Sequence, residues 1–315
     1  MTKEEFQFLI DTKKEYEFSY NGKKYNITYG TDEFHRDYIQ FGELYTGTRW
    51  YSLGELLNEA KVENHYFREM IEILKKKRNT AMTQEEIQTL YSQTDELLAI
   101  YERNCPITED GFNLGMVKLT LEQMIDFTIQ NAAEKQALLD SMETHDFYKS
   151  PASTRFHGDF ESGLCVHTLQ VIYQSLKFAR PVLDDFFRSK FADRYSFAAK
   201  DIFIAALAHD FCKAGSYEIN FRNTKDIFGN WTKKSYYKTR DDLRNLGHGN
   251  ESVLILLEVM PSYIKNRIVI EAVSRHMGFS DLSDLERMNY SNFLTNPLVV
   301  LLQLADQTAS AWYEN

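Results

Sequence analysis

Histidine and aspartate residues recur along the second half of the chain in an order that suits metal binding. The series comprises His167, His209, Asp210, His248, His276 and Asp306. Imidazole nitrogens and carboxylate oxygens are common ligands of divalent manganese, iron, cobalt, nickel and zinc, and an adjacent His-Asp pair can supply two ligands to one ion. The series therefore predicts a site for one or two divalent ions, whose identity the ligand types leave open among these metals.

Two apolar stripes lead to members of this series, which indicates that these members point inward. The residues of each stripe follow at intervals of four and so share one face of a helix. One stripe runs through Ile264, Ile268, Ala272 and His276, and the other through Leu298, Leu302 and Asp306. A lone histidine on such a face is more often a hydrogen-bonded core residue, which is the alternative for His276. An ionised carboxylate there is costly unless a cation or hydrogen bonds compensate it, so we expect Asp306 to face a metal ion.

Longer stretches around these residues resemble one enzyme family. The sequence reads PASTRFH up to His157, SGLCVHTL around His167, AHDFCK around the His-Asp pair, GHGNES around His248 and RHMG around His276. Over residues 145–315 the chain is similar to the HD-domain metal-dependent phosphohydrolases, whose ligand pattern H…HD…H…H…D lies on a bundle of helices. Within that family it most resembles uncharacterised hydrolases of low-GC Gram-positive bacteria and their phages. A more distant likeness is to the HD domain of bacterial 3′–5′ exoribonucleases.

The resemblance implies how the series would be used. One ion would be held by His167, His209, Asp210 and Asp306. His248 and His276 would hold a second ion, with Asp210 bridging the two, or would contact phosphate; we favour two ions because both histidines are present. A divalent ion lowers the pKa of bound water toward neutrality, so that water becomes a nucleophile. The residues expected to take part in the reaction are Asp210, Lys213, His248 and His276.

A basic and aromatic segment begins just after the His-Asp pair. Between residues 213 and 240, seven lysines and arginines stand against two acidic residues, although the whole chain carries a net charge of −10. Such a segment would attract a phosphorylated ligand, and its rings would stack on a base; ordinary packing of a hairpin is the alternative. The residues expected to bind substrate are Arg155, His157, Lys213, Tyr237 and Lys238.

Composition limits the class of protein. With 315 residues, of which 43% are hydrophobic and 26% charged, the chain has the make-up of a soluble globular protein. Its net acidity disfavours a protein that coats duplex nucleic acid. Cys105, Cys165 and Cys212 show no CxxC spacing, and we find no signal peptide and no stretch long enough to span a membrane. We therefore expect a cytoplasmic protein that binds a small phosphorylated molecule such as a nucleotide, or single-stranded nucleic-acid ends, and no membrane. The oligomeric state is left open.

The predicted fold is mainly α and divides into three segments. Residues 1–75 are expected to form a small α+β module and residues 76–144 a helical connector. Residues 145–315 are expected to form an all-helical HD-domain bundle with a β-hairpin insertion.

Local signals place the elements of this fold. Alternating residues predict strands at 16–20 and 24–29, joined by Asn21-Gly22, a third strand at 38–41, and a hairpin of 217–221 with 231–237. A long amphipathic helix is expected to run from Thr120 toward Met142. The residues predicted to begin helices by capping them are Ser52, Thr83, Thr120 and Asn296.

The function predicted by these observations is that of a metal-dependent phosphohydrolase. It would use metal-activated water to hydrolyse a phosphoester of a nucleotide or a short nucleotide ester. The alternatives are a 3′–5′ exonuclease or cyclic-nucleotide phosphodiesterase, and a non-catalytic nucleotide sensor. The intact ligand set disfavours the sensor, because binding without turnover does not require every ligand.

Overall fold

The computed structural model describes residues 10–13, 15–20, 23–44, 46–69, 82–243, 246–280 and 282–313. The chain divides into two compact units, one ending at residue 81 and the other beginning at Met82. The predicted boundary at residue 75 lies outside the described residues. The helices between Met82 and residue 144, in the segment predicted to be a helical connector, pack in the same unit as residues 145–315.

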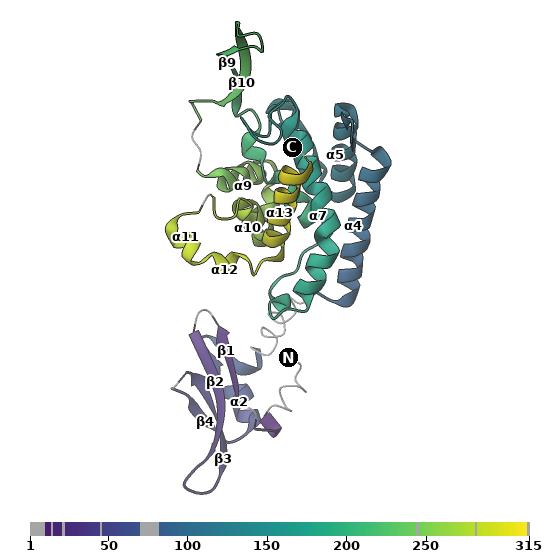
Figure 1. Cartoon of the computed structure of the whole chain (residues 1–315). Coiled ribbons are helices and arrows are strands. Elements are labelled where there is room, and N and C mark those ends of the chain that lie inside the picture. Colours follow the sequence, from purple (N-terminus) through teal and green to yellow (C-terminus); the bar gives the residue numbers. More distant parts are fainter. Residues whose placement is uncertain are drawn as a thin grey trace. The chain divides into compact units, whose positions relative to one another are not determined.

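Helices make up most of the second unit, which confirms the prediction of a mainly α fold (Figure 1). The longer helices are α4 (Gln84–Asn104), α5 (Leu114–Thr128), α6 (Ala132–Thr144), α7 (Gly163–Phe187), α8 (Ala199–Ala208), α9 (His248–Val259), α10 (Arg267–Arg275) and α13 (Pro297–Thr308). The shorter turns of helix are η1 (Ala192–Arg194), η2 (Phe211–Lys213), η3 (Pro261–Lys265), α11 (Asp284–Met288), α12 (Tyr290–Phe293) and η4 (Ala309–Tyr313). Each helix in the described part of the chain is too short or too polar to cross a bilayer.

The first unit contains an antiparallel sheet of four strands in the order β1-β2-β3-β4. The strands are β1 (Tyr16–Tyr20), β2 (Lys23–Thr31), β3 (Asp37–Glu43) and β4 (Thr48–Trp50), followed by α2 (Leu53–Glu59) and the short pair β5 (Lys61–Val62) and β6 (His65–Tyr66). The three predicted strands are confirmed, while the predicted turn at Asn21-Gly22 lies outside the described residues. Ser52 caps α2 as predicted, since its side chain accepts from the Glu55 amide. A core of its own, with Ile27, Phe41 and Leu56, supports this unit.

Of two predicted helix starts in the second unit, one is confirmed and the other is wrong. Thr83 forms the predicted capping box with Glu86 at the start of α4. The start at Thr120 is wrong, because Asn113 caps α5 through the Met116 amide and Thr120 lies in mid-helix, where its hydroxyl donates to the Met116 carbonyl. The single helix predicted to reach Met142 is in fact two, since Asn131 caps α6. Between α4 and α5 lies the short pair β7 (Ile107–Thr108) and β8 (Gly111–Phe112).

Helix α8 runs through the centre of the helical unit. Its residues from Asp201 to Ala208 are all buried, and it packs against α7, α10 and α13. Such a helix is apolar on every side because every side meets another helix. It ends immediately before His209 and Asp210, so both residues lie in the interior of the bundle.

One of the two apolar stripes is shorter than predicted. Ile264 lies in η3 and its side chain is exposed. The expected helix is interrupted after this turn, because Asn266 caps a new helix, α10. Ile268 and Ala272 are buried on α10, which ends directly before the buried His276. The stripe on α13 is present as predicted, with both leucines buried and Asn296 capping the helix at the Leu298 amide.

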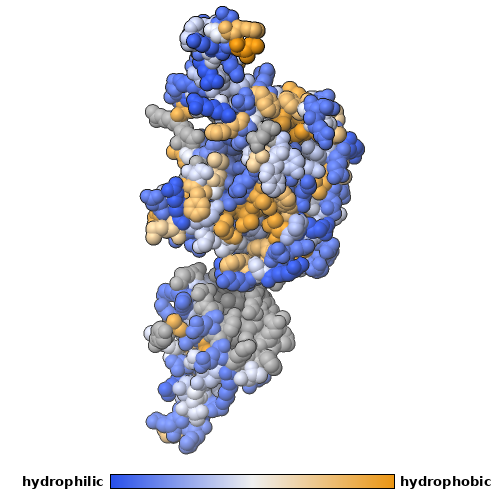
Figure 2. All heavy atoms as spheres, in the orientation of Figure 1, coloured by the Kyte–Doolittle hydropathy of each residue, from blue (hydrophilic) through white to orange (hydrophobic). Residues whose placement is uncertain are grey.

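The predicted hairpin is present and is longer than expected. It consists of β9 (Tyr217–Lys225) paired antiparallel with β10 (Trp231–Thr239), and it projects from the helices (Figure 1). Apolar residues gather at its free end above a hydrophilic stem (Figure 2). The most exposed of these are Ile227, Phe228 and Trp231.

Candidate metal centre

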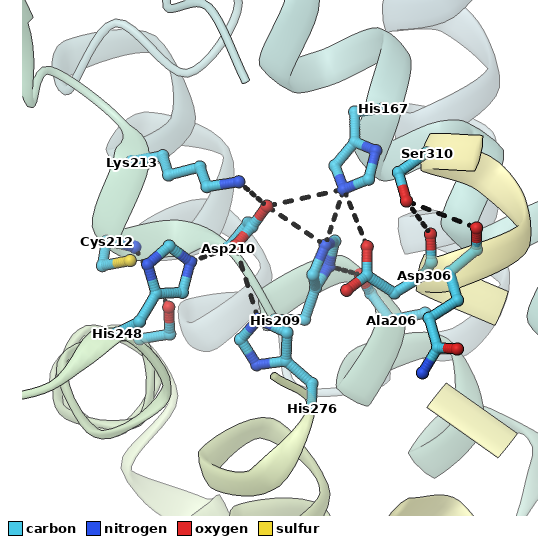
Figure 3. A network of polar contacts seen from close by, with 12 residues as sticks. His167, Ala206, His209, Asp210, Cys212, Lys213, His248, His276, Asp306 and Ser310 are labelled. Atoms are coloured by element: carbon cyan, nitrogen blue, oxygen red, sulfur yellow. Dashed lines mark hydrogen bonds and ion pairs between the residues drawn. The ribbon is translucent and has the colours of Figure 1, made fainter. Parts of the chain in front are cut away.

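The six residues of the His/Asp series meet at one point in the helical unit (Figure 3). They come from α7 (His167), the end of α8 (His209 and Asp210), the first residue of α9 (His248), the end of α10 (His276) and α13 (Asp306). The side chains of His248 and Asp306 remain 21% and 18% exposed, whereas the other four are almost fully buried. Part of the side chain of each of these two residues is therefore exposed to solvent.

The first half of the cluster is centred on the Nε2 atom of His167. This atom lies 3.2 Å from His209 Nε2 and 3.3 Å from Asp306 Oδ1. Asp210 Oδ2 lies 3.5 Å from the same atom and 3.3 Å from His209 Nε2. Ligands bound at about 2.0–2.1 Å to one tetrahedral ion stand roughly 3.3 Å apart. The spacing of these atoms therefore fits ligands that share an ion.

The second half of the cluster faces the other oxygen of Asp210. Asp210 Oδ1 lies 2.6 Å from His248 Nε2 and 3.5 Å from His276 Nε2. The rings of His248 and His276 are 5.4 Å apart. One carboxylate thus separates two pairs of histidines, with one oxygen turned toward each pair. This is the arrangement that a carboxylate bridging two ions requires.

Backbone carbonyl groups orient two of the rings toward the centre. His209 Nδ1 lies 2.7 Å from the Ala206 carbonyl oxygen, and His276 Nδ1 lies 2.7 Å from that of Val273. A carbonyl oxygen only accepts, so each Nδ1 carries the proton and each Nε2 presents a lone pair to the cluster. The buried Nε2 of His276 has no hydrogen-bond partner among the described residues. A cation would satisfy this atom, so the donor set fits a metal ion.

Charges within the cluster keep the carboxylates ionised. Burial raises the pKa of Asp210, but the positive charges of Lys213 and His248 hold it well below its usual range. Burial likewise raises the pKa of Asp306, but its hydrogen bond to His167 and the charge of that ring outweigh burial and lower it. One buried and one partly buried negative charge in the same place create a site that attracts cations.

Lys213 and His248 provide positive charge beside Asp210 in this structure. Lys213 Nζ lies 2.7 Å from Asp210 Oδ2, and its side chain is 11% exposed. Burial lowers the pKa of Lys213, but the charge and hydrogen bond of Asp210 overcome this and raise it to about 12. Burial also lowers the pKa of His248, but the charge and hydrogen bond of Asp210 outweigh burial and raise this pKa to about 10. The sequence predicted that Lys213 contacts phosphate, whereas here its ammonium group is bound to Asp210.

Cys212 is a possible ligand that the sequence analysis did not include. Its sulfur and the ligand atoms of Asp210 and His248 all lie within 4.8 Å of one another, and the residue is buried. The Cys212 amide donates to Ser252 Oγ on α9, which fixes this turn of η2 against the helix that carries His248. Its position two residues after Asp210 was the only signal in the sequence.

The close approach of α9 and α10 depends on a glycine. A Cβ atom on Gly249 would collide with the Ser274 carbonyl group and lie 2.8 Å from the Val273 carbonyl oxygen. The Val273 oxygen is also the atom that orients His276. Gly249 therefore allows the helix of His248 to lie close enough to the helix of His276 for both rings to reach Asp210.

We expect Gly249→Ala to destabilise the helical unit by about 1–3 kcal/mol, because the added methyl group forces the two helices apart. Thermal unfolding measures this loss, and elemental analysis should show less bound metal. Gly54→Ala in α2 is a matched control, since its Cβ would meet nothing nearer than Ser52 Oγ at 3.8 Å. If Gly249→Ala is as stable as this control and binds as much metal as the unaltered protein, the glycine has no such role.

The residues predicted to bind substrate fall into different places. The ring of His157 lies 4.7 Å from that of His167, so this residue borders the cluster. Arg155 and Tyr237 line one cleft between the loop before α7 and the hairpin. Lys238 does not line that cleft, and its ammonium group lies 2.5 Å from Asp241 Oδ2. The structure thus brings two of the predicted contacts together in a cleft and leaves Lys238 apart from it.

No family model, no curated protein and no solved structure matches the chain. The structure itself shows a mainly α unit with a buried His/Asp cluster that could hold a metal ion. The likeness to the HD family therefore rests on the motifs and on the order of these residues along the chain.

Proposed function

We propose that the protein is a metal-dependent phosphohydrolase of the HD type that hydrolyses a phosphoester of a nucleotide or a short nucleotide ester. The observation that carries this proposal is the carboxylate of Asp210, which turns Oδ2 toward His167 and His209 and Oδ1 toward His248 and His276. Two ions on either side of one carboxylate suit the in-line displacement at a phosphate group.

The first ion would be held by His167, His209, Asp210 and Asp306, and the second by Asp210, His248 and His276, with Cys212 within reach of the second. When bound, divalent ions supply a nucleophile from water at neutral pH and neutralise charge on the phosphate. In the reaction the bond from phosphorus to the ester oxygen would break, the oxygen of water would bond to phosphorus in its place, and a proton of that water would pass to the departing oxygen.

The protein's own side chains would position the phosphate. An ion held by Asp210 would replace Lys213 as the partner of that carboxylate, which frees the ammonium group for a phosphate oxygen or for the leaving oxygen one helical turn away. His157 lies against the ring of His167 and would contact the phosphate from the loop before α7. His248 is the partly exposed histidine of the cluster and therefore the one nearest to an entering substrate.

A 3′–5′ exonuclease or cyclic-nucleotide phosphodiesterase is the second candidate. The observation that favours it is the cleft beside the cluster, which Arg155, Arg222 and Lys234 line with positive charge. If a nucleotide with a second phosphate group bound at the metal centre, the second phosphate could bind in this cleft.

A hydrolysis screen tests the proposal. The protein is supplied with manganese, iron, cobalt, nickel or zinc and offered nucleoside mono-, di- and triphosphates, cyclic mono- and dinucleotides and short oligonucleotides, with products identified by mass. We expect turnover of at least one of these substrates that is lost on chelation. Tight binding of a nucleotide without turnover under every metal would instead support a sensor, and no bound metal at all would contradict the proposal.

A further inference from the structure

A polar cleft of about 620 Å³ lies between the loop before α7 and the hairpin. Its charged and aromatic lining consists of Arg155, Asp159, Arg222, Lys234, Tyr236 and Tyr237. Three cations against one carboxylate give it a positive balance in a chain whose net charge is −10. A second cavity, of about 330 Å³, is lined mainly by apolar side chains of α6 and α9 and contains no lysine or arginine.

The cations of the cleft are available to a ligand. Arg222 and Lys234 face each other directly across the two strands, and like charges in such positions repel unless an anion lies between or beside them. Arg222 lies 5.5 Å from the ring of Tyr236, but among the described residues none of the three cations forms an ion pair with a carboxylate. A pair of uncompensated cations beside two tyrosine rings suits a phosphate group with an aromatic base attached.

Two short stretches of chain connect the cleft to the metal centre. In the loop before α7, Arg155 lines the cleft and His157, two residues later, packs on His167. At the base of the hairpin, Ser216 is hydrogen-bonded to the carbonyl groups of Cys212 and Lys213, and Ile219, three residues later, lines the cleft. Extended chain spans at most about 3.6 Å per residue, so these connections cover no more than roughly 7 and 11 Å. The cleft therefore borders the cluster.

We infer that this cleft binds a second phosphate group of the substrate, which makes the substrate a dinucleotide or the end of a short single strand. The inference rests on the proposed phosphohydrolase function for the phosphate at the metal centre. Adjacent phosphates of a polyphosphate share an oxygen, so we expect them to lie together at the metal centre. Phosphates on the two sides of a nucleoside are separated by its sugar, and a base next to them can stack on Tyr236 or Tyr237.

Binding of two matched ligands to three proteins tests this inference. The probes are 5′-phosphorylated thymidine dinucleotide, with two phosphate groups, and thymidine monophosphate, with one. The proteins are the unaltered chain, the double variant Arg222→Ala/Lys234→Ala, and the control Lys225→Ala/Lys233→Ala, which removes two cations of the hairpin that do not line the cleft. Titration calorimetry on the proteins as purified, without added metal, measures affinity independently of turnover.

We expect the double variant to bind the dinucleotide about five- to thirtyfold more weakly, because two exposed charge contacts together contribute about 1–2 kcal/mol. Its affinity for the monophosphate and both affinities of the control should change less than about twofold. The dependence of log affinity on log salt should also become shallower by about 0.7 for the dinucleotide, the amount expected for one lost phosphate contact on a single strand.

Each other outcome has a definite meaning. Equal dinucleotide affinity in the double variant and the unaltered protein would overturn the inference. Equal weakening for both ligands would also overturn it, since the cleft would then hold the same phosphate that the monophosphate supplies. Hydrolysis of p-nitrophenyl phosphate with manganese is measured separately. If that activity is absent but the double variant still binds the dinucleotide selectively more weakly, the proposed phosphohydrolase function is contradicted and the inferred phosphate site in the cleft is supported.

Discussion

Asp210→Asn is expected to abolish metal binding and to destabilise the helical unit by about 3–5 kcal/mol. The carboxylate contacts both pairs of histidines, so its loss would remove a ligand from each proposed ion. It is also the partner of Lys213, whose ammonium group would be left buried without an opposite charge. Turnover should fall about a thousandfold or more, which corresponds to some 4 kcal/mol of lost transition-state stabilisation.

A second variant separates the loss of metal from the loss of stability. Asp210→Asn/Lys213→Met removes both members of the buried ion pair and keeps similar volumes, so most of the stability should return. This variant should remain folded and still bind no metal, as measured by thermal unfolding and elemental analysis. Full metal content in either variant would show that Asp210 is not a ligand. A double variant no more stable than Asp210→Asn would show that the destabilisation does not arise from Lys213.

His276→Ala is expected to remove one ion and leave the other. Its Nε2 belongs to the half of the cluster on Asp210 Oδ1, while His167, His209 and Asp306 surround the other half. Elemental analysis should show the metal content falling by about one ion per chain. Turnover should fall by about a hundredfold or more, since the loss of even an outer partner of a ligand costs 10–100-fold.

His145→Ala provides the matched control for this experiment. His145 ends α6, and its ring contacts the Ser141 carbonyl group outside the cluster, so neither metal content nor turnover should change. An unchanged metal content in His276→Ala, together with a raised KM, would assign His276 to phosphate binding in a centre with one ion.

The sequence by itself determined the residue types of the site and the elements that carry them. The order of histidines and aspartates predicted a metal centre, and the leucine stripe of α13 indicated that Asp306 points inward. The capping box at Thr83 and the two strands of the hairpin were also predicted correctly. These features depend on residues within a few positions of one another, whose interactions are fixed by the geometry of a single helix turn or strand pair.

Local signals were insufficient where two of them competed. Thr120 with Gln123 looks like a cap, but Asn113 caps the helix earlier and leaves Thr120 inside it. Ile264 has the spacing of the α10 stripe, but Asn266 caps a new helix after it and leaves Ile264 exposed. In both cases an asparagine side chain that accepts from a helix amide decided the boundary.

Only the tertiary structure decided how the site residues face one another. The two oxygens of Asp210 are divided between two pairs of histidines, three of which lie tens of residues away along the chain, and Lys213 pairs with the same carboxylate. The approach of α9 to α10 depends on the missing side chain of Gly249. Distances of this kind are set by the packing of whole helices, in which shape and volume matter as much as polarity, so no pattern of nearby residues contains them.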